Sequence, residues 1–162
     1  MCPAALWCEG SGVLKEYRLG FDGPGFGLFL LIMLPNFLWF ALPAPVDVLR
    51  QPSATPRLDQ AASVVQVLLV AALCLVKNRR AQSIFKRPGT ATGILLLYLG
   101  YLLAWVCYYQ GVLHPLLLLA MCVLPCLALL LYATARKNWI AVVPAAVFLL
   151  LHTLFGLVNF LL

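Results

Sequence analysis

Five apolar stretches, each about 20 residues long, dominate this chain and leave few choices of fold. A helix of about 20 apolar residues is long enough to cross the hydrocarbon core of a bilayer. We therefore predict an all-α fold, a polytopic transmembrane bundle of about five helices that forms a single domain. The expected spans are residues 24–45, 56–76, 90–110, 115–135 and 139–161, and a segment of residues 1–23 precedes them.

Composition excludes a soluble globule. Apolar residues make up 64% of the 162 positions and charged residues only 10%, whereas soluble domains contain roughly 45–50% apolar and about 25% charged residues. The net charge of +6 does not indicate a nucleic-acid partner, because the basic residues lie between apolar runs and form no patch interleaved with aromatic residues. Membrane lipids are the partners that this composition predicts.

The distribution of Lys and Arg predicts the orientation. Nine of the eleven basic residues lie in the N-terminal segment, in the 77–89 loop or in the 133–138 turn. The other two, Arg50 and Arg57, lie near the loop that follows the first span. Basic loops remain in the cytoplasm. We therefore expect the N-terminus, and with it residues 1–23, to lie inside the cell and the C-terminus outside.

Polar side chains at membrane depth are the candidate site. No Asp, Glu, Lys or Arg lies well inside a span, which argues against a proton pump built on a buried carboxylate. Helical spacing places the polar residues of the second span on one face, and those of the fifth span likewise. One interpretation is a ligand pocket that opens outward, between spans one, two and five; the other is that these residues join helices by hydrogen bonds. The candidate pocket residues are Asn36, Asp59, Ser63, Gln66, His152 and Asn159.

The third span carries two stripes. Small residues allow close helix packing in lipid, and we expect such packing at Gly93, Gly100, Ala104 and Gly111. A neighbouring aromatic stripe either fills space between helices or forms one wall of a ligand cavity; it consists of Tyr98, Tyr101, Trp105 and Tyr108.

Proline and cysteine carry weaker signals. Pro35, which Asn36 follows directly, and Pro125 lie inside spans and are expected to kink them. Cys122 and Cys126 share a helical face, and with Cys74 or Cys107 they could hold a soft metal. Cysteine inside apolar segments is more often a small hydrophobic residue, so we predict no metal site and no cofactor.

Signatures of catalysis are absent. The sequence contains no phosphate-binding loop of the G-x-x-x-x-G-K-[ST] type, no H-E-x-x-H and no C-x-x-C. Asp47, Asp59 and His114 are all expected on the outer side, where a loose metal site or an enzyme centre is conceivable. No catalytic residue is predicted.

A resemblance rests on the first half of the chain. The residues that carry it are GFGLFLLIMLPNFLWFALPAPVDVLRQPSATPRLDQAASVVQVLL. With its Pro-Asn pair inside a span, its Pro-rich loop and its Leu-Asp entry to the next span, this stretch resembles small polytopic membrane proteins of Gram-positive bacteria, for which no activity is assigned. The resemblance implies a bacterial cytoplasmic membrane location and draws attention to Pro35-Asn36 and Asp59. The residues before Leu14 depart from the pattern, so whether they belong to the native N-terminus stays open.

Three functions remain open at this point. We rank first a structural, accessory or assembly protein that associates with its own copies or with another membrane protein. A small carrier or channel-like subunit that uses the polar pocket is second. A membrane-embedded enzyme is third, because nucleophiles and metal ligands are few.

Overall fold

The structure, a computed structural model that describes residues 16–162, consists of five long helices. Each of the five has the length and the apolar composition needed to cross a membrane. The all-α prediction is therefore confirmed, and the chain is a multi-pass membrane protein. The first 15 residues, including Lys15 and most of the predicted segment 1–23, lie outside the described residues. The helices are α1 (Gly23–Ala41), α2 (Pro56–Leu75), α3 (Pro88–Tyr109), α4 (Pro115–Ala135) and α5 (Trp139–Phe160).

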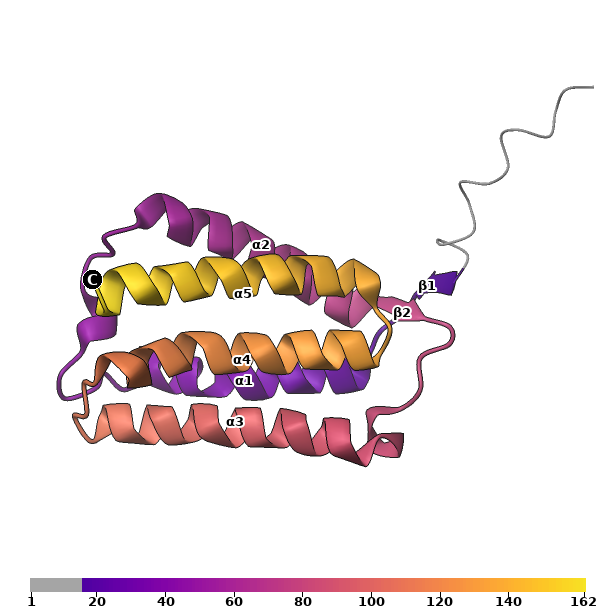
Figure 1. The fold of residues 1–162 in the computed structure, drawn as a ribbon, viewed down its shortest axis with the longest axis horizontal. Helices are drawn as coiled ribbons and strands as arrows, with labels where there is room; N and C mark the ends of the chain where they lie inside the picture. The colour runs from indigo at the N-terminus through magenta and orange to yellow at the C-terminus, as the bar shows by residue number, and fades with distance from the viewer. Residues whose placement is uncertain (1–15) are drawn as a thin grey trace, which may run out of the picture.

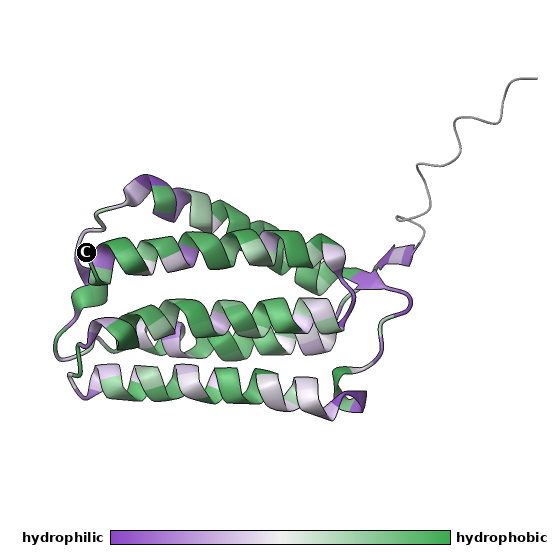
Figure 2. Ribbon diagram, viewed as in Figure 1, coloured by the Kyte–Doolittle hydropathy of each residue, from purple (hydrophilic) through white to green (hydrophobic). Residues whose placement is uncertain are grey.

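Four helices form a row, and the fifth lies against it (Figure 1). α4 packs between α3 and α5, and α2 packs on the other side of α5. α1 contacts α2, α3 and α4. Hydrophobic residues dominate all five helices (Figure 2), and many of the large ones are exposed, as expected of surfaces that face lipid.

The connections gather at two opposite ends of the bundle (Figure 1). Residues 42–55, residues 110–114 and the C-terminus lie at one end, which we call the loop end. The 76–87 and 136–138 segments lie at the other, which we call the basic end because most of the Lys and Arg residues are there.

α1 is shorter than the predicted first span. It ends at Ala41 rather than near residue 45. Pro43 has no N–H and restricts the residue before it to an extended conformation, and Leu42 accordingly has φ −127° and ψ 98°. The segment after Ala41 therefore leaves the helix and forms a short 3-10 turn, Val48–Arg50, before α2 begins.

A small sheet at the basic end was not predicted. β1 (Tyr17–Leu19) pairs antiparallel with β2 (Val76–Asn78). The pairing extends into the helix ends, because the Asp22 N–H donates to the Cys74 carbonyl at 2.7 Å. Three-residue strands leave too little alternation for a sequence pattern to reveal. The sheet fixes the entry to α1 against the end of α2.

A buried ion pair joins α1 to the α4–α5 turn. Arg136 lies 3.1 Å from Asp22, and the two side chains are only 15% and 5% exposed. Two residues after Arg136, the Asn138 amide donates to the carbonyls of Ala72 and Val76. The turn between α4 and α5 therefore holds both the beginning of α1 and the end of α2.

The arrangement of ends predicts a labelling pattern. Single cysteines replacing the exposed residues Gln51, Gln82 and Gln110, in a chain without native cysteines, would be probed with a membrane-impermeant maleimide on intact cells. We expect positions 51 and 110 to react alike and position 82 to behave oppositely, because an odd number of spans separates it from each. Identical labelling of all three positions would contradict five crossings.

Removing one partner of the buried ion pair should destabilise the fold strongly. Arg136→Gln leaves the Asp22 carboxylate buried and unpaired, which typically costs about 3–5 kcal/mol. Double replacement, Asp22→Asn with Arg136→Gln, should recover part of that loss because no buried charge remains. Thermal unfolding of the full chain in detergent measures both. A single variant as stable as the parent would show that this pair does not hold the helices.

Candidate functional site: a polar cleft between α2 and α5

Four of the six predicted pocket residues meet between α2 and α5. Asp59, Ser63 and Gln66 follow one another at spacings of four and three, so one face of α2 presents all three. His152 faces them from α5. With Ala62 and Phe155, these four side chains line a cavity of about 230 Å³, which we call the His152 cavity.

A second cavity continues from the first toward the loop end. It has a volume of about 330 Å³ and is lined by the 48–53 segment, Asn159 and Phe160. Asp59 and Phe155 line both cavities. We call this second space the loop cavity; the shared pair separates it from His152.

Asn159 holds the wall of the loop cavity in place. Its side-chain oxygen accepts a hydrogen bond from the Ala54 N–H at 2.8 Å, and its amide donates to the Thr55 hydroxyl at 3.0 Å. The amide also donates to the Phe155 carbonyl one turn back. These hydrogen bonds hold residues 54 and 55 against α5, so Asn159 acts as a positioning residue for the loop.

Two atoms in the His152 cavity have no partner. Asp59 Oδ1 and His152 Nδ1 are buried and make no hydrogen bond within residues 16–162. The Ser63 hydroxyl donates to the Asp59 backbone carbonyl at 2.8 Å. Gln66 directs its amide toward the Met33 sulfur, 3.9 Å away. The cavity therefore presents a carboxylate oxygen, an imidazole nitrogen and further oxygen lone pairs.

Asn36 does not join this group. Its amide donates to the Tyr101 hydroxyl at 2.9 Å, and the Tyr101 hydroxyl donates to the Ile32 carbonyl at 3.2 Å. These contacts tie α1 to α3, beside Pro35. The expected convergence of three spans is therefore a convergence of α2 and α5, to which α1 contributes only Met33. Asn36 instead joins α1 to α3 by a hydrogen bond.

The small and aromatic residues of α3 pack inside the chain. A Cβ on Gly93 would lie 3.2 Å from the Leu131 side chain, and one on Gly100 would lie 3.3 Å from Leu124, so both glycines let α4 approach closely. Ala104 is buried, whereas Gly111 lies in the turn after α3 with φ +82°. Of the aromatic stripe, Tyr101, Trp105 and Tyr108 are buried.

The metal alternatives gain no support from the geometry. Across residues 16–162 no three His, Cys, Asp or Glu side chains form a group that could hold a metal ion. His114 instead caps α4, because its Nδ1 accepts a hydrogen bond from the Leu116 N–H. Cys126 donates its thiol hydrogen to the Cys122 carbonyl within the same helix.

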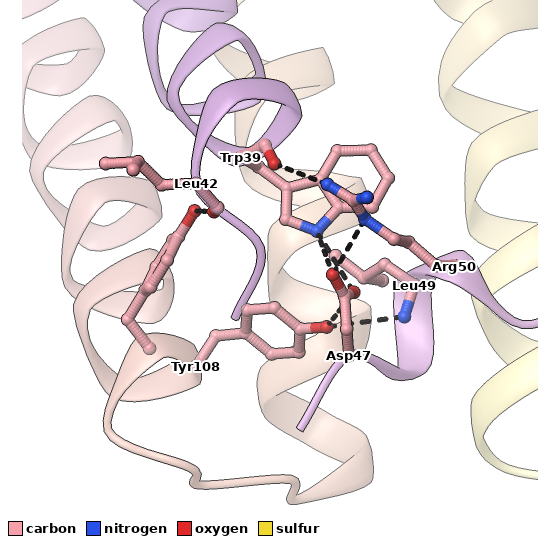
Figure 3. A network of polar contacts seen from close by, with 7 residues as sticks. Trp39, Leu42, Asp47, Leu49, Arg50 and Tyr108 are labelled. Atoms are coloured by element: carbon pink, nitrogen blue, oxygen red, sulfur yellow. Dashed lines mark hydrogen bonds and ion pairs between the residues drawn. The ribbon is translucent and has the colours of Figure 1, made fainter. Parts of the chain in front are cut away.

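Asp47 forms the most connected polar network at the loop end, and sequence patterns did not reveal it (Figure 3). Its carboxylate accepts hydrogen bonds from Trp39 Nε1 at 2.9 and 3.0 Å and from the Tyr108 hydroxyl at 2.8 Å. Arg50 pairs with it at 3.0 Å and lies over the Trp39 ring. The network fixes the 42–55 segment to α1 and α3, so the Asp47 carboxylate is fully engaged within the protein.

The surroundings of Asp47 set its ionisation. Burial alone raises the pKa of this carboxyl, but the hydrogen bonds from Tyr108 and Trp39 and the charge of Arg50 favour the ionised form. Their combined effect is larger, and the pKa lies below its ordinary value. Asp47 therefore stays ionised through the physiological range.

Comparisons with protein-family models, with curated proteins and with solved structures found no match. The chemistry assigned to the cleft therefore rests on its own residues.

Neutralising Asp47 should weaken the loop end and remove part of the acid sensitivity. Asp47→Asn loses charged hydrogen bonds that are typically worth about 1.5–3 kcal/mol each. Since the pKa is depressed, this stabilisation is present above the unfolded value of about 3.9 and disappears as the pH falls through the folded value. Unfolding in detergent between neutral and acid pH measures the effect.

Glu16→Gln is the matched control for this carboxylate. Glu16 pairs with Arg80 at 3.0 Å, but both side chains are well exposed, and exposed pairs are worth about 0–1 kcal/mol. Equal losses in the two variants would contradict the role given to the Asp47 network.

Proposed function

We propose that this chain binds a small organic cation, a protonated or quaternary amine, in the cleft between α2 and α5. One observation carries the proposal: Asp59 Oδ1 and His152 Nδ1 line the same cavity, are buried, and have no partner among the described residues. Buried polar atoms in proteins are nearly always hydrogen-bonded, and an ionisable side chain well inside a span, here His152, is expected to be functional.

The lining supports a cation rather than an anion. Asp59 supplies a carboxylate, and an unprotonated Nδ1 of His152 would supply a lone pair. The Ser63 hydroxyl hydrogen is already donated to the Asp59 carbonyl, so this oxygen offers only lone pairs to a ligand. No Lys or Arg lines the His152 cavity. The N–H groups of a protonated amine would donate to these acceptors, a quaternary ammonium would meet the Asp59 carboxylate through charge alone, and an anion would face that carboxylate.

Aromatic rings support an organic cation. The Phe155 ring lies 6.2 Å from the His152 ring. Phe155 also lines both cavities. Ring faces attract ammonium groups, most strongly where water is excluded.

The dimensions support a small ligand and an entry from the loop end. Sites for drug-sized ligands have volumes of about 300–1,000 Å³, and the His152 cavity is smaller, at about 230 Å³. The loop cavity shares Asp59 and Phe155 with it, and we propose that a ligand enters through this side. A cation would thus meet the carboxylate first and the imidazole second.

The location and the orientation are part of the proposal. The excess of Lys and Arg at the basic end supports a cytoplasmic position for that end. The resemblance of the first half to membrane proteins of Gram-positive bacteria supports the bacterial cytoplasmic membrane. The loop cavity then opens outside the cell, and the chain acts as a receptor or as a small carrier subunit.

An accessory or assembly role is the second candidate, although the sequence ranked it first. That ranking relied in part on the lack of buried charge, and the buried oxygen of Asp59 weakens this reason. The small residues of α3 are also engaged within the chain, by α4. The exposed apolar faces of the helices still favour contact with lipids or with another membrane helix.

Binding to the purified chain tests the proposal. Isothermal titration would compare choline with its neutral carbon isostere, 3,3-dimethylbutan-1-ol. We expect the cation to bind and the isostere to bind much more weakly. Asp59→Asn should weaken choline binding at least about 30-fold, because losing one partner of a desolvated charge pair costs about 2–5 kcal/mol. His152→Phe should also weaken it.

His114→Asn, a substitution at the histidine outside the cleft, is the matched control for His152→Phe. Asparagine is a good residue at the start of a helix, so the α4 cap should persist, and choline binding should match the parent. Equal binding of cation and isostere, or full binding by Asp59→Asn, would overturn the proposal. Uptake into proteoliposomes then separates a carrier from a receptor.

A further inference from the structure

We infer that the basic end binds an anionic phospholipid, with one acyl chain in an apolar groove between α1 and α3 and the headgroup beside Lys86 and Arg87. This site is separate from the cation cleft, which lies between α2 and α5. The inference does not depend on the function proposed for that cleft.

The groove has a volume of about 360 Å³ and an almost wholly apolar lining. One wall belongs to α1, where Gly27, Leu28 and Leu31 contribute. Ile94, Leu95 and Tyr98 of α3 form the other, and Phe85 closes it toward the basic end. A space with this lining between two membrane-spanning helices suits a hydrocarbon chain that lies along them.

The polar end of the groove is strongly basic. Phe85 lies in the 3-10 turn Ile84–Lys86, which leads directly into α3. Its side chain is 80% exposed, as expected of an aromatic residue at a membrane interface. The next two residues are Lys86 and Arg87, and the 77–87 segment carries five basic residues and no acidic one.

These charges are largely available to a ligand. Within residues 16–162, the ion pairs are those of Arg50, Arg80 and Arg136. Lys86 and Arg87 therefore have no acidic partner in the described part of the chain. The phosphate of a phospholipid placed beside Lys86 and Arg87 would neutralise these charges. An acyl chain of the same lipid would reach the apolar lining of the groove.

Charge complementarity selects the occupant. A neutral phospholipid or a helix of a partner would fill the apolar groove but would leave the two cations at its mouth unmatched. An anionic phospholipid satisfies both parts of the site. Basic residues near a membrane surface each strengthen binding to anionic lipid by a factor of about five.

Native mass spectrometry of the full chain tests the inference. The protein in detergent would receive phosphatidylglycerol or phosphatidylcholine with identical acyl chains. We expect preferential retention of phosphatidylglycerol. Lys86→Gln combined with Arg87→Gln should weaken its retention by roughly 30-fold, by the factor of about five for each charge, and should leave phosphatidylcholine unchanged.

Gly27→Leu tests the groove itself. A Cβ built on Gly27 meets no atom within 4 Å, so the longer side chain extends into the groove without a backbone clash. We expect this variant to lose the bound phosphatidylglycerol. Gly23→Leu is the matched control, because Gly23 is equally open but does not line the groove.

Three results would overturn the inference. They are equal retention of the two lipids by the parent chain, unchanged phosphatidylglycerol binding by the charge variant, and equal binding by Gly27→Leu and Gly23→Leu. Helix content and thermal unfolding, measured for each variant, establish that the bundle is intact.

Discussion

Hydrocarbon offers no hydrogen bonds, so each polar group that this chain carries into the bundle needs a partner within the protein. Hydrogen bonds and ion pairs between such groups tie the helices at their ends. Asp22 and Arg136 pair at the basic end. Asn138 holds the end of α2 there by donating hydrogen bonds to the carbonyls of Ala72 and Val76. Asp47 joins α1, α3 and the 42–55 segment at the loop end. Between these ends, apolar side chains pack against each other or face lipid.

Five buried side-chain atoms of the described residues depart from this rule, and two of them lie in the cleft between α2 and α5. Asp59 and His152 place unpartnered buried atoms in one cavity, although Asn159, close to Asp59, is fully engaged with the loop. A buried polar group left without a partner costs about 1–3 kcal/mol. Asp22 Oδ1, Trp105 Nε1 and the Tyr132 hydroxyl are also buried without a partner among the described residues, but only Asp59 and His152 line one cavity together among the cavities described above. Under the proposed function, the acceptor character of this lining favours a cation.

Periodicity and charge predicted most of the fold because lipid imposes simple rules on length and loops. They also placed Asp59, Ser63 and Gln66 on one face, since helical spacing fixes that geometry. They did not exclude Asn36 from the group, because the rotation of α1 depends on which helix it meets, and Tyr101 was visible only as one member of an aromatic stripe. The Asp47 network escaped prediction because Pro43 ends α1 early and folds a loop residue back onto Trp39 and Tyr108.

If the cleft binds a cation as proposed, water and cations reach the His152 cavity from the loop end. A cysteine at Gln66, in a chain without native cysteines, tests it with a quaternary-ammonium methanethiosulfonate added from one side at a time. The account predicts modification from the loop end, slowed by choline, while Val67→Cys, whose side chain is 69% exposed toward lipid, stays unmodified. Modification of Gln66→Cys no faster than that of Val67→Cys, or only from the basic end, would contradict it.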